Sequence, residues 1–151
     1  MAILAIKPAS GTDDFQFQDS SGNAILQVDG DGSRVDYKKG ISENANTLTQ
    51  SSATITIDLA TGTFFEFTLT ENVTGWTFSN VPTTGTACSW VVKITQHASS
   101  AKTVVYPAGV KWAGGTYHEM STTVDAIDII SMFTIDGGTT IFANEVGKAF
   151  A

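Results

Sequence analysis

The sequence predicts an all-β protein: an antiparallel β-sandwich, jelly-roll-like, with a small N-terminal β-meander and arm. Three observations predict this class. Helical periodicity is almost absent from the 151 residues, period-two alternation of apolar and polar residues recurs, and turn signals separate the alternating runs at short spacing. Short strands at such spacing, without helices between them, are typical of sandwiches and barrels.

The N-terminal region predicts a small element of its own. The run DFQFQDSSGNAILQVDGDGSRVDY is typical of three strands, with SSGN and DGDG as the turns. Phe15 and Phe17 alternate with Gln in the first strand, and two or three short strands are rarely stable alone in water. We therefore expect residues 1–41 to form an arm and meander for attachment and oligomerisation. A polar linker, residues 42–53, then leads to a sandwich domain, residues 54–151.

The remaining chain contains seven runs that predict strands. They span Thr54–Leu59, Phe64–Thr70, Trp76–Ser79, Ser89–Gln96, Lys102–Pro107, Asp125–Ile135 and Thr139–Asn144. The run from Ile129 to Ile135 is apolar on both faces, which is typical of a strand in the middle of a sandwich or covered by another subunit. The DGGT that follows predicts a tight hairpin turn, because Gly137 and Gly138 accept positive φ.

Composition argues against several classes of function. The formal net charge is −7, and Lys7, Lys38 and Lys39 are too few to form a basic patch, so we expect no nucleic-acid partner. No apolar run approaches the length of a membrane span and none resembles a signal peptide, so we expect no membrane partner and synthesis in the cytoplasm. The single cysteine, Cys88, excludes an internal disulfide and is predicted to be a buried, inert thiol.

Metal motifs are weak in this sequence. DGDGS at residues 29–33 places carboxylates at alternate positions, but Arg34 stands where a calcium loop needs glycine and no Glu follows at residues 36–40, which favours a plain turn. His97 and His118 have no second His or Cys at ligand spacing, which argues against zinc. We expect neither a metal nor a cofactor.

Catalytic motifs are equally weak. A triad would have to combine a Ser or Cys with His118 and an acid such as Asp125, and no strand-turn-helix elbow presents the nucleophile. Asp125 and Asp128 are an odd number of residues apart and point to opposite faces of a strand, so they do not form a glycosidase pair, even with Glu119 nearby. We expect no enzymatic activity and no catalytic residues.

Aromatic residues offer a different kind of site. Trp76 and Trp90 lie within alternating strands, where packing in the core is the usual role. Trp112 and Tyr117 instead flank the loop sequence AGG, and this position favours an exposed contact with a ligand, such as a sugar, or with a partner.

The segment from Ile55 to Phe142 resembles a β-domain of tailed-bacteriophage virion proteins. The resemblance rests on the order of an L-x-x-G-x-x-F opening, a V-T-x-x-T-F-S-N strand, a Y-P-x-x-V-K-W-x-G-G loop and a D-I-I-S-x-F-T-x-D-G-G-T hairpin. The N-terminal FQFQDSSGNAILQVDGDG is similar to short β segments of trimeric phage fibres. The resemblance implies a module for assembly or display on a head or a tail, and it carries over no catalytic residue.

Two virion functions remain open, and the chain has no repeats for a long fibre shaft. The first is a non-enzymatic decoration or cement protein on the capsid surface, a homotrimer bound to the major capsid protein. The second is a short tail-fibre or receptor-binding tip, in which Trp112 and Tyr117 contact a host glycan. For attachment we expect the apolar residues Ile3, Leu4 and Ile6 to add as a strand to a partner's sheet edge, supported by the meander residues Phe15 and Phe17.

Overall fold

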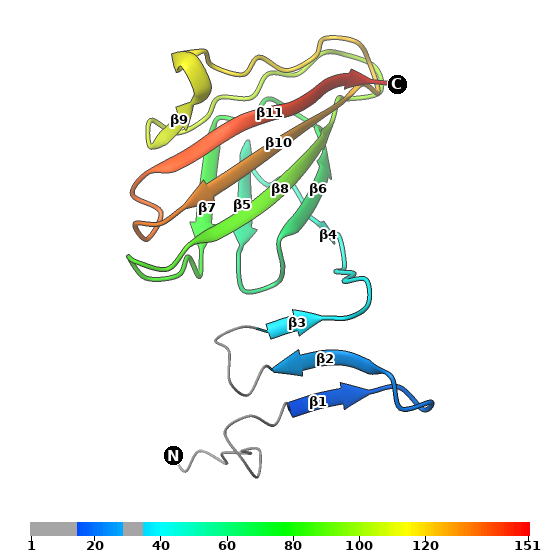
Figure 1. The fold of residues 1–151 in the computed structure, drawn as a ribbon. Coiled ribbons are helices and arrows are strands. Elements are labelled where there is room, and N and C mark those ends of the chain that lie inside the picture. Colours follow the sequence, from blue (N-terminus) through cyan, green and yellow to red (C-terminus); the bar gives the residue numbers. More distant parts are fainter. Residues whose placement is uncertain (1–14, 29–34) are drawn as a thin grey trace. The chain divides into compact units, whose positions relative to one another are not determined.

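The computed structural model describes residues 15–28 and 35–151 of the chain (Figure 1). The chain divides into two compact units, Met1–Ser42 and Glu43–Ala151. In the described residues every regular element is a β-strand, apart from one short 3-10 turn, so the all-β prediction is confirmed. The arm residues Ile3, Leu4 and Ile6 and the DGDGS motif at residues 29–33 lie outside the described residues.

The first unit contains a three-stranded antiparallel meander in the order β1-β2-β3. Its strands are β1 (Phe15–Gln18), β2 (Ala24–Val28) and β3 (Val35–Tyr37). The β1–β2 turn is closed by Asp19, whose carboxylate accepts hydrogen bonds from the backbone N–H groups of Ser21 and Asn23. These bonds hold the pKa of Asp19 below its usual value.

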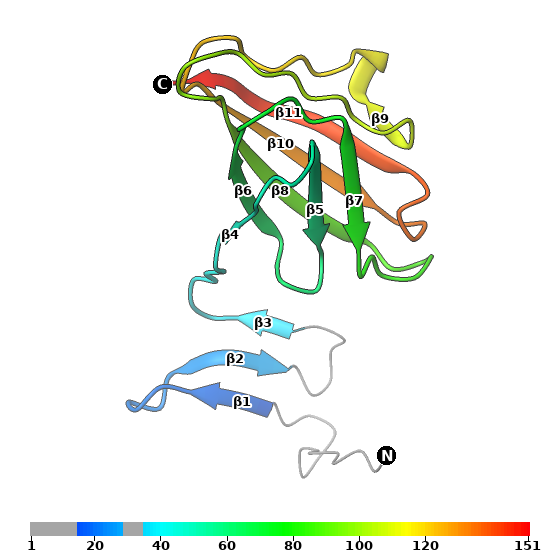
Figure 2. The ribbon, with the colours of Figure 1, turned by 180° about the vertical axis from the view of Figure 1, so that it is seen from behind.

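The second unit contains two further sheets. A six-stranded sheet has the order β4-β6-β8-β10-β11-β9, and a two-stranded sheet pairs β5 with β7. The strands are β4 (Asn46–Thr47), β5 (Thr54–Asp58), β6 (Phe64–Thr68), β7 (Gly75–Ser79), β8 (Cys88–Thr95), β9 (Val110–Trp112), β10 (Ile127–Thr134) and β11 (Ile141–Phe150). Figures 1 and 2 show the two sheets as two layers, with β5 and β7 lying across one face of the larger sheet.

The prediction of uniformly antiparallel pairing is wrong for this unit. Strand β8 pairs antiparallel with β10, and β10 with β11, but the pairs β4–β6, β6–β8, β5–β7 and β9–β11 are parallel. The cause is the path of the chain, since β4 to β8 alternate between the two sheets. Consecutive strands run in opposite directions in different layers, so the neighbours within one sheet are two strands apart in sequence and run the same way.

The core of the second unit lies between these layers. Strand after strand shows period-two burial, with one set of side chains turned inward and the other turned outward. The largest buried side chains come from β5, β6, β8 and β10 and include Ile55, Phe65, Trp90, Ile94 and Ile130. Trp90 therefore has the predicted core role, and Trp76 packs against the same cluster, whereas Cys88 is half-buried rather than buried as we expected.

The hairpin predicted from DGGT is confirmed. It joins β10 to β11, and Gly137 and Gly138 have φ angles of 70° and 83°, in the left-handed region that glycine adopts at low cost. The Asp136 carboxylate accepts the backbone N–H of Thr140 at 2.9 Å, and the Thr134 hydroxyl donates to the Thr140 carbonyl at 2.8 Å. These hydrogen bonds tie both ends of the turn together and hold its conformation.

Three segments differ from expectation. Residues 42–53, expected to be a polar linker, contain β4, which pairs with β6, and Leu48, which packs against the core. Residues 102–107 do not form a strand: Val104 makes a single bridge to Val73. Side chains satisfy much of this backbone instead, since the Trp76 indole N–H donates to the carbonyl of Val105 at 3.0 Å. Strand β9 was not predicted at all, being three residues long.

Candidate functional site

The predicted contact residues Trp112 and Tyr117 lie on one surface hollow of about 580 Å³. Strand β9 ends at Trp112 and the chain then turns through Ala113–Gly115, where Gly114 and Gly115 have φ angles of 68° and 71°. This turn returns the chain so that the rings of Trp112 and Tyr117 lie 6.2 Å apart between centroids. The full lining is Trp112, Ala113, Thr116, Tyr117, His118, Glu119, Asn144, Glu145 and Lys148.

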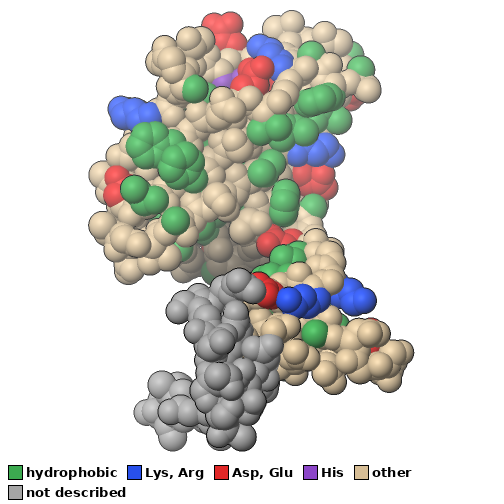
Figure 3. Space-filling view, viewed as in Figure 1, with side chains coloured by type: hydrophobic (Ala, Val, Ile, Leu, Met, Phe, Trp, Pro, Cys, Tyr) green, Lys and Arg blue, Asp and Glu red, His purple; other side chains and the backbone are tan. Residues whose placement is uncertain are grey.

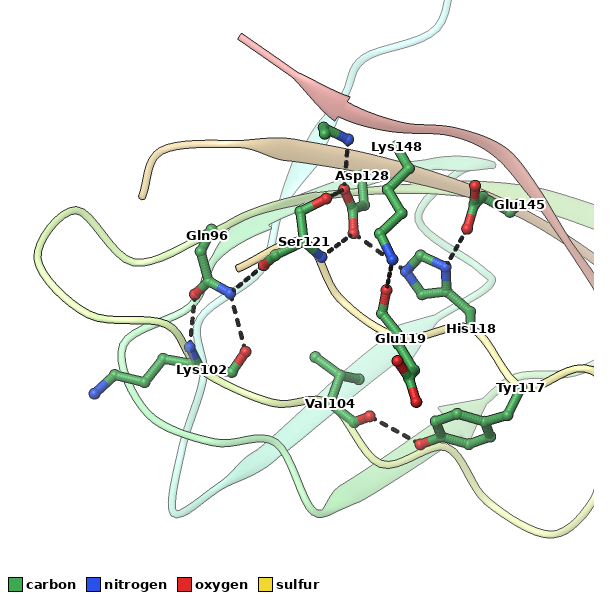
Figure 4. Close-up of polar contacts among 11 residues, drawn as sticks. Gln96, Lys102, Val104, Tyr117, His118, Glu119, Ser121, Asp128, Glu145 and Lys148 are labelled. Carbon is green, nitrogen blue, oxygen red and sulfur yellow. Dashed lines mark hydrogen bonds and ion pairs between the residues drawn. The ribbon is translucent and has the colours of Figure 1, made fainter. Parts of the chain in front are cut away.

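Tyr117 is held in place through its hydroxyl group. The hydroxyl donates a hydrogen bond to the Val104 carbonyl at 2.8 Å and accepts one from the Tyr106 backbone N–H at 2.7 Å. The Tyr117 side chain nevertheless remains 42% exposed. Its ring therefore presents a fixed aromatic surface to solvent, with the polar end already satisfied by the protein (Figure 4).

His118 lies beneath this surface, fully buried between two carboxylates (Figure 4). Its Nδ1 is 2.7 Å from Oε2 of Glu145, a hydrogen-bond distance. Its Nε2 is 3.3 Å from Oδ2 of Asp128, without the geometry of a hydrogen bond. The imidazole also stacks on Trp112, with 5.7 Å between ring centroids and 24° between planes. His118 thus connects the aromatic wall of the hollow to β10 and β11.

Asp128 anchors this arrangement from the interior. The carboxylate is completely buried and accepts three hydrogen bonds: from the Ser121 N–H at 2.8 Å, the Ser121 hydroxyl at 2.5 Å and the Ala149 N–H at 2.9 Å. Burial by itself would raise the pKa of Asp128, but the bonds from Ala149 and Ser121, together with the nearby His118, bring the pKa below its usual value. Asp128 therefore binds the 119–121 segment and β11 to β10 as an anion.

Gln96 extends the buried network towards the next loop. Its amide nitrogen donates to the carbonyls of Lys102 and Ser121 at 2.9 and 2.8 Å, and its amide oxygen accepts the N–H groups of His97 and Lys102. All its hydrogen-bonding capacity is used on backbone groups that no strand satisfies. A buried amide in this position fixes two irregular segments against the end of β8.

Ser, His and Asp do meet here, but not in the order of a nucleophilic triad. The Ser121 hydroxyl donates to Asp128 rather than to His118, and Ser121 is buried. Asp125, the acid considered from sequence, is exposed in the turn before β10, whereas Asp128 lies within β10 and points inward, so the two do not converge, although they do not share a strand as the spacing argument assumed. Within residues 15–28 and 35–151, no group of three or more His, Cys, Asp or Glu side chains is placed to hold a metal ion.

A second hollow of about 360 Å³ adjoins the first on the outward face of the six-stranded sheet. The two share Trp112, Ala113 and Asn144 as lining residues. The second is largely apolar, and its aromatic wall is the pair Phe133 and Phe142, which stack with 5.0 Å between centroids. Figure 3, which looks onto this sheet, shows hydrophobic side chains gathered in patches on its exposed face.

The sequence did not predict the side of the first hollow that the last strand forms. Asn144, Glu145 and Lys148 come from β11, which continues to Phe150 although the alternating pattern indicated an end at Asn144. Of the attachment residues, Phe17 is 55% exposed in β1, and the side chain of Phe15 lies outside the described structure.

Comparisons of the chain with protein-family models, with curated proteins and with solved structures gave no match. In residues 15–28 and 35–151 there is no apolar helix of membrane-spanning length.

Proposed function

We propose that the protein is a structural component of a tailed-bacteriophage virion, a decoration or cement protein on the capsid surface without enzymatic activity. The observation that carries this proposal is the exposed apolar surface of the N-terminal meander. Its strands and the residues after them leave large apolar side chains in solvent: Phe17, Ile25, Val28, Val35, Tyr37 and Ile41. A three-stranded sheet of this size gains too little from its own packing, so these side chains favour cover by a partner.

The sequence resemblance and the layered second unit support the same function. The motifs shared with phage virion β-domains fall on consecutive parts of the second unit, from β5 to the β10–β11 hairpin. We assign this unit as a β-sandwich that is jelly-roll-like in its two layers, though not in the direction of its strand pairs. A decoration protein needs such a stable unit for display and a separate element for attachment.

The attachment experiment uses purified capsids that lack this protein. Removal of residues 1–7, which include Ile3, Leu4 and Ile6, is expected to abolish capsid binding, because the apolar arm supplies the strand that docks on the major capsid protein. The measured quantity is the number of bound chains per capsid by quantitative mass spectrometry, with the unaltered chain as reference. Wild-type occupancy by the truncated chain would place the anchor elsewhere.

A second candidate is a short tail-fibre or receptor-binding tip, and the hollow beside Trp112 and Tyr117 favours it. Copy number separates the two functions, because decoration requires tens to hundreds of chains per virion and a fibre requires few. Gold-labelled antibody against this chain on intact virions gives the location directly. Label on the tail alone would reject the decoration proposal and support the second candidate.

A further inference from the structure

We propose that the two adjoining hollows form one binding groove for a neutral oligosaccharide. The groove runs from Tyr117 and Glu145, past Trp112 and Asn144, to the stacked pair Phe133 and Phe142. This inference deepens the second candidate above and does not depend on capsid attachment. It rests on the shape of the surface, on the kinds of side chain that line it, and on how firmly those side chains are held.

The shape fits an elongated ligand. The hollows measure about 580 and 360 Å³ and meet at Trp112, Ala113 and Asn144. In the sheet register, Phe142 lies opposite Phe133, and Asn144 lies opposite Ser131. The outward face of β10 and β11 therefore offers successive rows of side chains along the direction of the strands. A chain of sugar rings can lie over these rows with one ring in each hollow.

The lining matches the two kinds of surface that a sugar presents. A pyranose ring has an apolar C–H face, which packs against aromatic rings, and an edge of hydroxyl groups that both donate and accept hydrogen bonds. Tyr117 and the Phe133–Phe142 pair supply aromatic surface at the two ends, with Tyr117 42% exposed and the two phenylalanines 46% and 42%. Between them Asn144 supplies an amide that both donates and accepts.

The polar groups of the groove remain available to a ligand. Within the part of the chain that the structure describes, the side chains of Asn144 and Glu119 have no hydrogen-bond partner, and both residues are exposed. Glu145 uses one oxygen, Oε2, on His118, which leaves its other oxygen for hydroxyl groups. In ligand-binding pockets, the polar side chains that contact the ligand are usually few, point towards one another and lie beside aromatic surface.

The groove is also built on fixed supports. His118 is buried beneath Trp112, holds Glu145 and lies next to Asp128, which itself accepts three hydrogen bonds. The conformational entropy of these side chains is therefore lost on folding rather than on binding, and such preorganisation favours affinity. These supports distinguish the groove residues from ordinary surface side chains, which are free to move.

Charge selects a neutral ligand. The first hollow is lined by the carboxylates of Glu119 and Glu145 and by the amine of Lys148, which donates to the Glu119 carbonyl. The second hollow adds the amine of Lys111, which donates to the Ala108 carbonyl, so the positive and negative side chains of the groove balance. The chain as a whole carries a formal charge of −7. The groove therefore has no excess of positive charge to hold a uronic acid or sialylated chain, and the net negative charge of the protein repels such a chain, whereas a neutral hexose or N-acetylhexosamine chain meets no repulsion.

The test titrates the full-length protein with maltohexaose, cellohexaose, chitohexaose and hexagalacturonate, with binding followed by calorimetry and tryptophan fluorescence. We expect saturable binding of at least one neutral oligosaccharide with a Kd of about 0.1–1 mM, and none of hexagalacturonate. Asn144→Trp, which fills the junction between the hollows, should weaken binding at least about tenfold. Phe64→Ser is the matched control, because Phe64 is an exposed aromatic on the same sheet that lines neither hollow.

Three results would overturn the proposal: no saturable binding of any neutral oligosaccharide, tightest binding of hexagalacturonate, or equal loss of binding in Asn144→Trp and Phe64→Ser. Thermal melts of both variants establish that each is folded. The capsid occupancy assay is separate from these titrations, so a failure of the groove and a failure of the attachment proposal are distinguishable.

Discussion

A single buried carboxylate organises the region around the groove. Asp128 points into the core from β10, where a charge is costly unless it is fully hydrogen-bonded. Its partners, Ser121 and the Ala149 N–H, belong to segments distant in sequence, so one side chain joins a loop and the last strand to β10. His118, Trp112 and Glu145 depend on this arrangement, since the imidazole lies between Asp128 and Glu145.

The substitution Asp128→Asn should therefore destabilise the protein at neutral pH by about 2–4 kcal/mol, because an amide cannot accept all three hydrogen bonds and leaves a buried donor unpaired. The folded-state pKa of Asp128 lies below its ordinary 3.8, so the ionised group stabilises the fold above about pH 3.8. This stabilisation is lost as the pH falls through the lower folded-state pKa. Urea unfolding across a pH series measures the difference.

Asp125→Asn is the matched control, since Asp125 is exposed and the same chemical change there should alter stability by less than about 0.5 kcal/mol. A difference between wild type and Asp128→Asn that stays constant down to pH 2 would contradict the role of the ionised carboxylate.

At the scale of the elements, the sequence predicted what depends on local pattern. Alternation located β5, β6, β8 and β10, and paired glycines located the β10–β11 turn. It did not predict strand direction, because alternation is the same for parallel and antiparallel strands, and direction here follows from a chain that changes sheets. The strand expected at residues 102–107 failed because the Trp76 and Tyr117 side chains take hydrogen bonds that a neighbouring strand would otherwise make.

Local sequence pattern also predicted only part of the binding groove. The AGG loop indicated that Trp112 and Tyr117 are exposed, and this holds for Tyr117 alone, because Trp112 is half-buried and packs against the core. Glu145 and Lys148 were missed because the last strand loses its alternation after Asn144 and pairs with β10 through shifts in register. The pairing of His118 with Asp128 joins a loop to a strand and leaves no periodic signal in either segment.

The parallel pairing of β5 and β7 makes a sharp prediction at Gly75. A Cβ atom there would lie 2.8 Å from Oγ1 of Thr54, its register partner, a distance shorter than real contacts. Gly75→Ala should cost about 1–3 kcal/mol of stability through overpacking. The double variant Thr54→Ala with Gly75→Ala should recover most of that loss in urea unfolding.

Gly40→Ala serves as control, because nothing lies within 4 Å of the position that an added Cβ atom would take there. If Gly75→Ala proves as harmless as this control, β5 and β7 do not approach each other as the register requires.

At the scale of the whole molecule, the division into Met1–Ser42 and Glu43–Ala151 separates two physical roles. Every member of the buried apolar cluster belongs to the second unit, from Leu48 to Ala143. Among its described residues, the first unit instead exposes several large apolar side chains, Tyr37 and Ile41 by more than 60%. The second unit therefore has the buried core needed for independent stability, and the first has exposed apolar surface of the kind that marks a protein–protein contact.

Removal of residues 1–42 should accordingly leave a folded second unit that unfolds cooperatively, while the intact chain should be a homotrimer that this truncation reduces to a monomer. In a trimer the exposed apolar side chains of three meanders would be buried against one another, and a small three-stranded sheet gains little stability from its own packing. Light scattering at micromolar concentration gives the mass of each form, and circular dichroism melts report folding.

A substitution of Phe17 and Tyr37 by Ser in the full chain provides the milder variant, which should weaken the trimer without loss of the second unit. A trimeric truncated chain would move the interface to the second unit, and a monodisperse monomer of the intact chain would reject trimerisation through the meander.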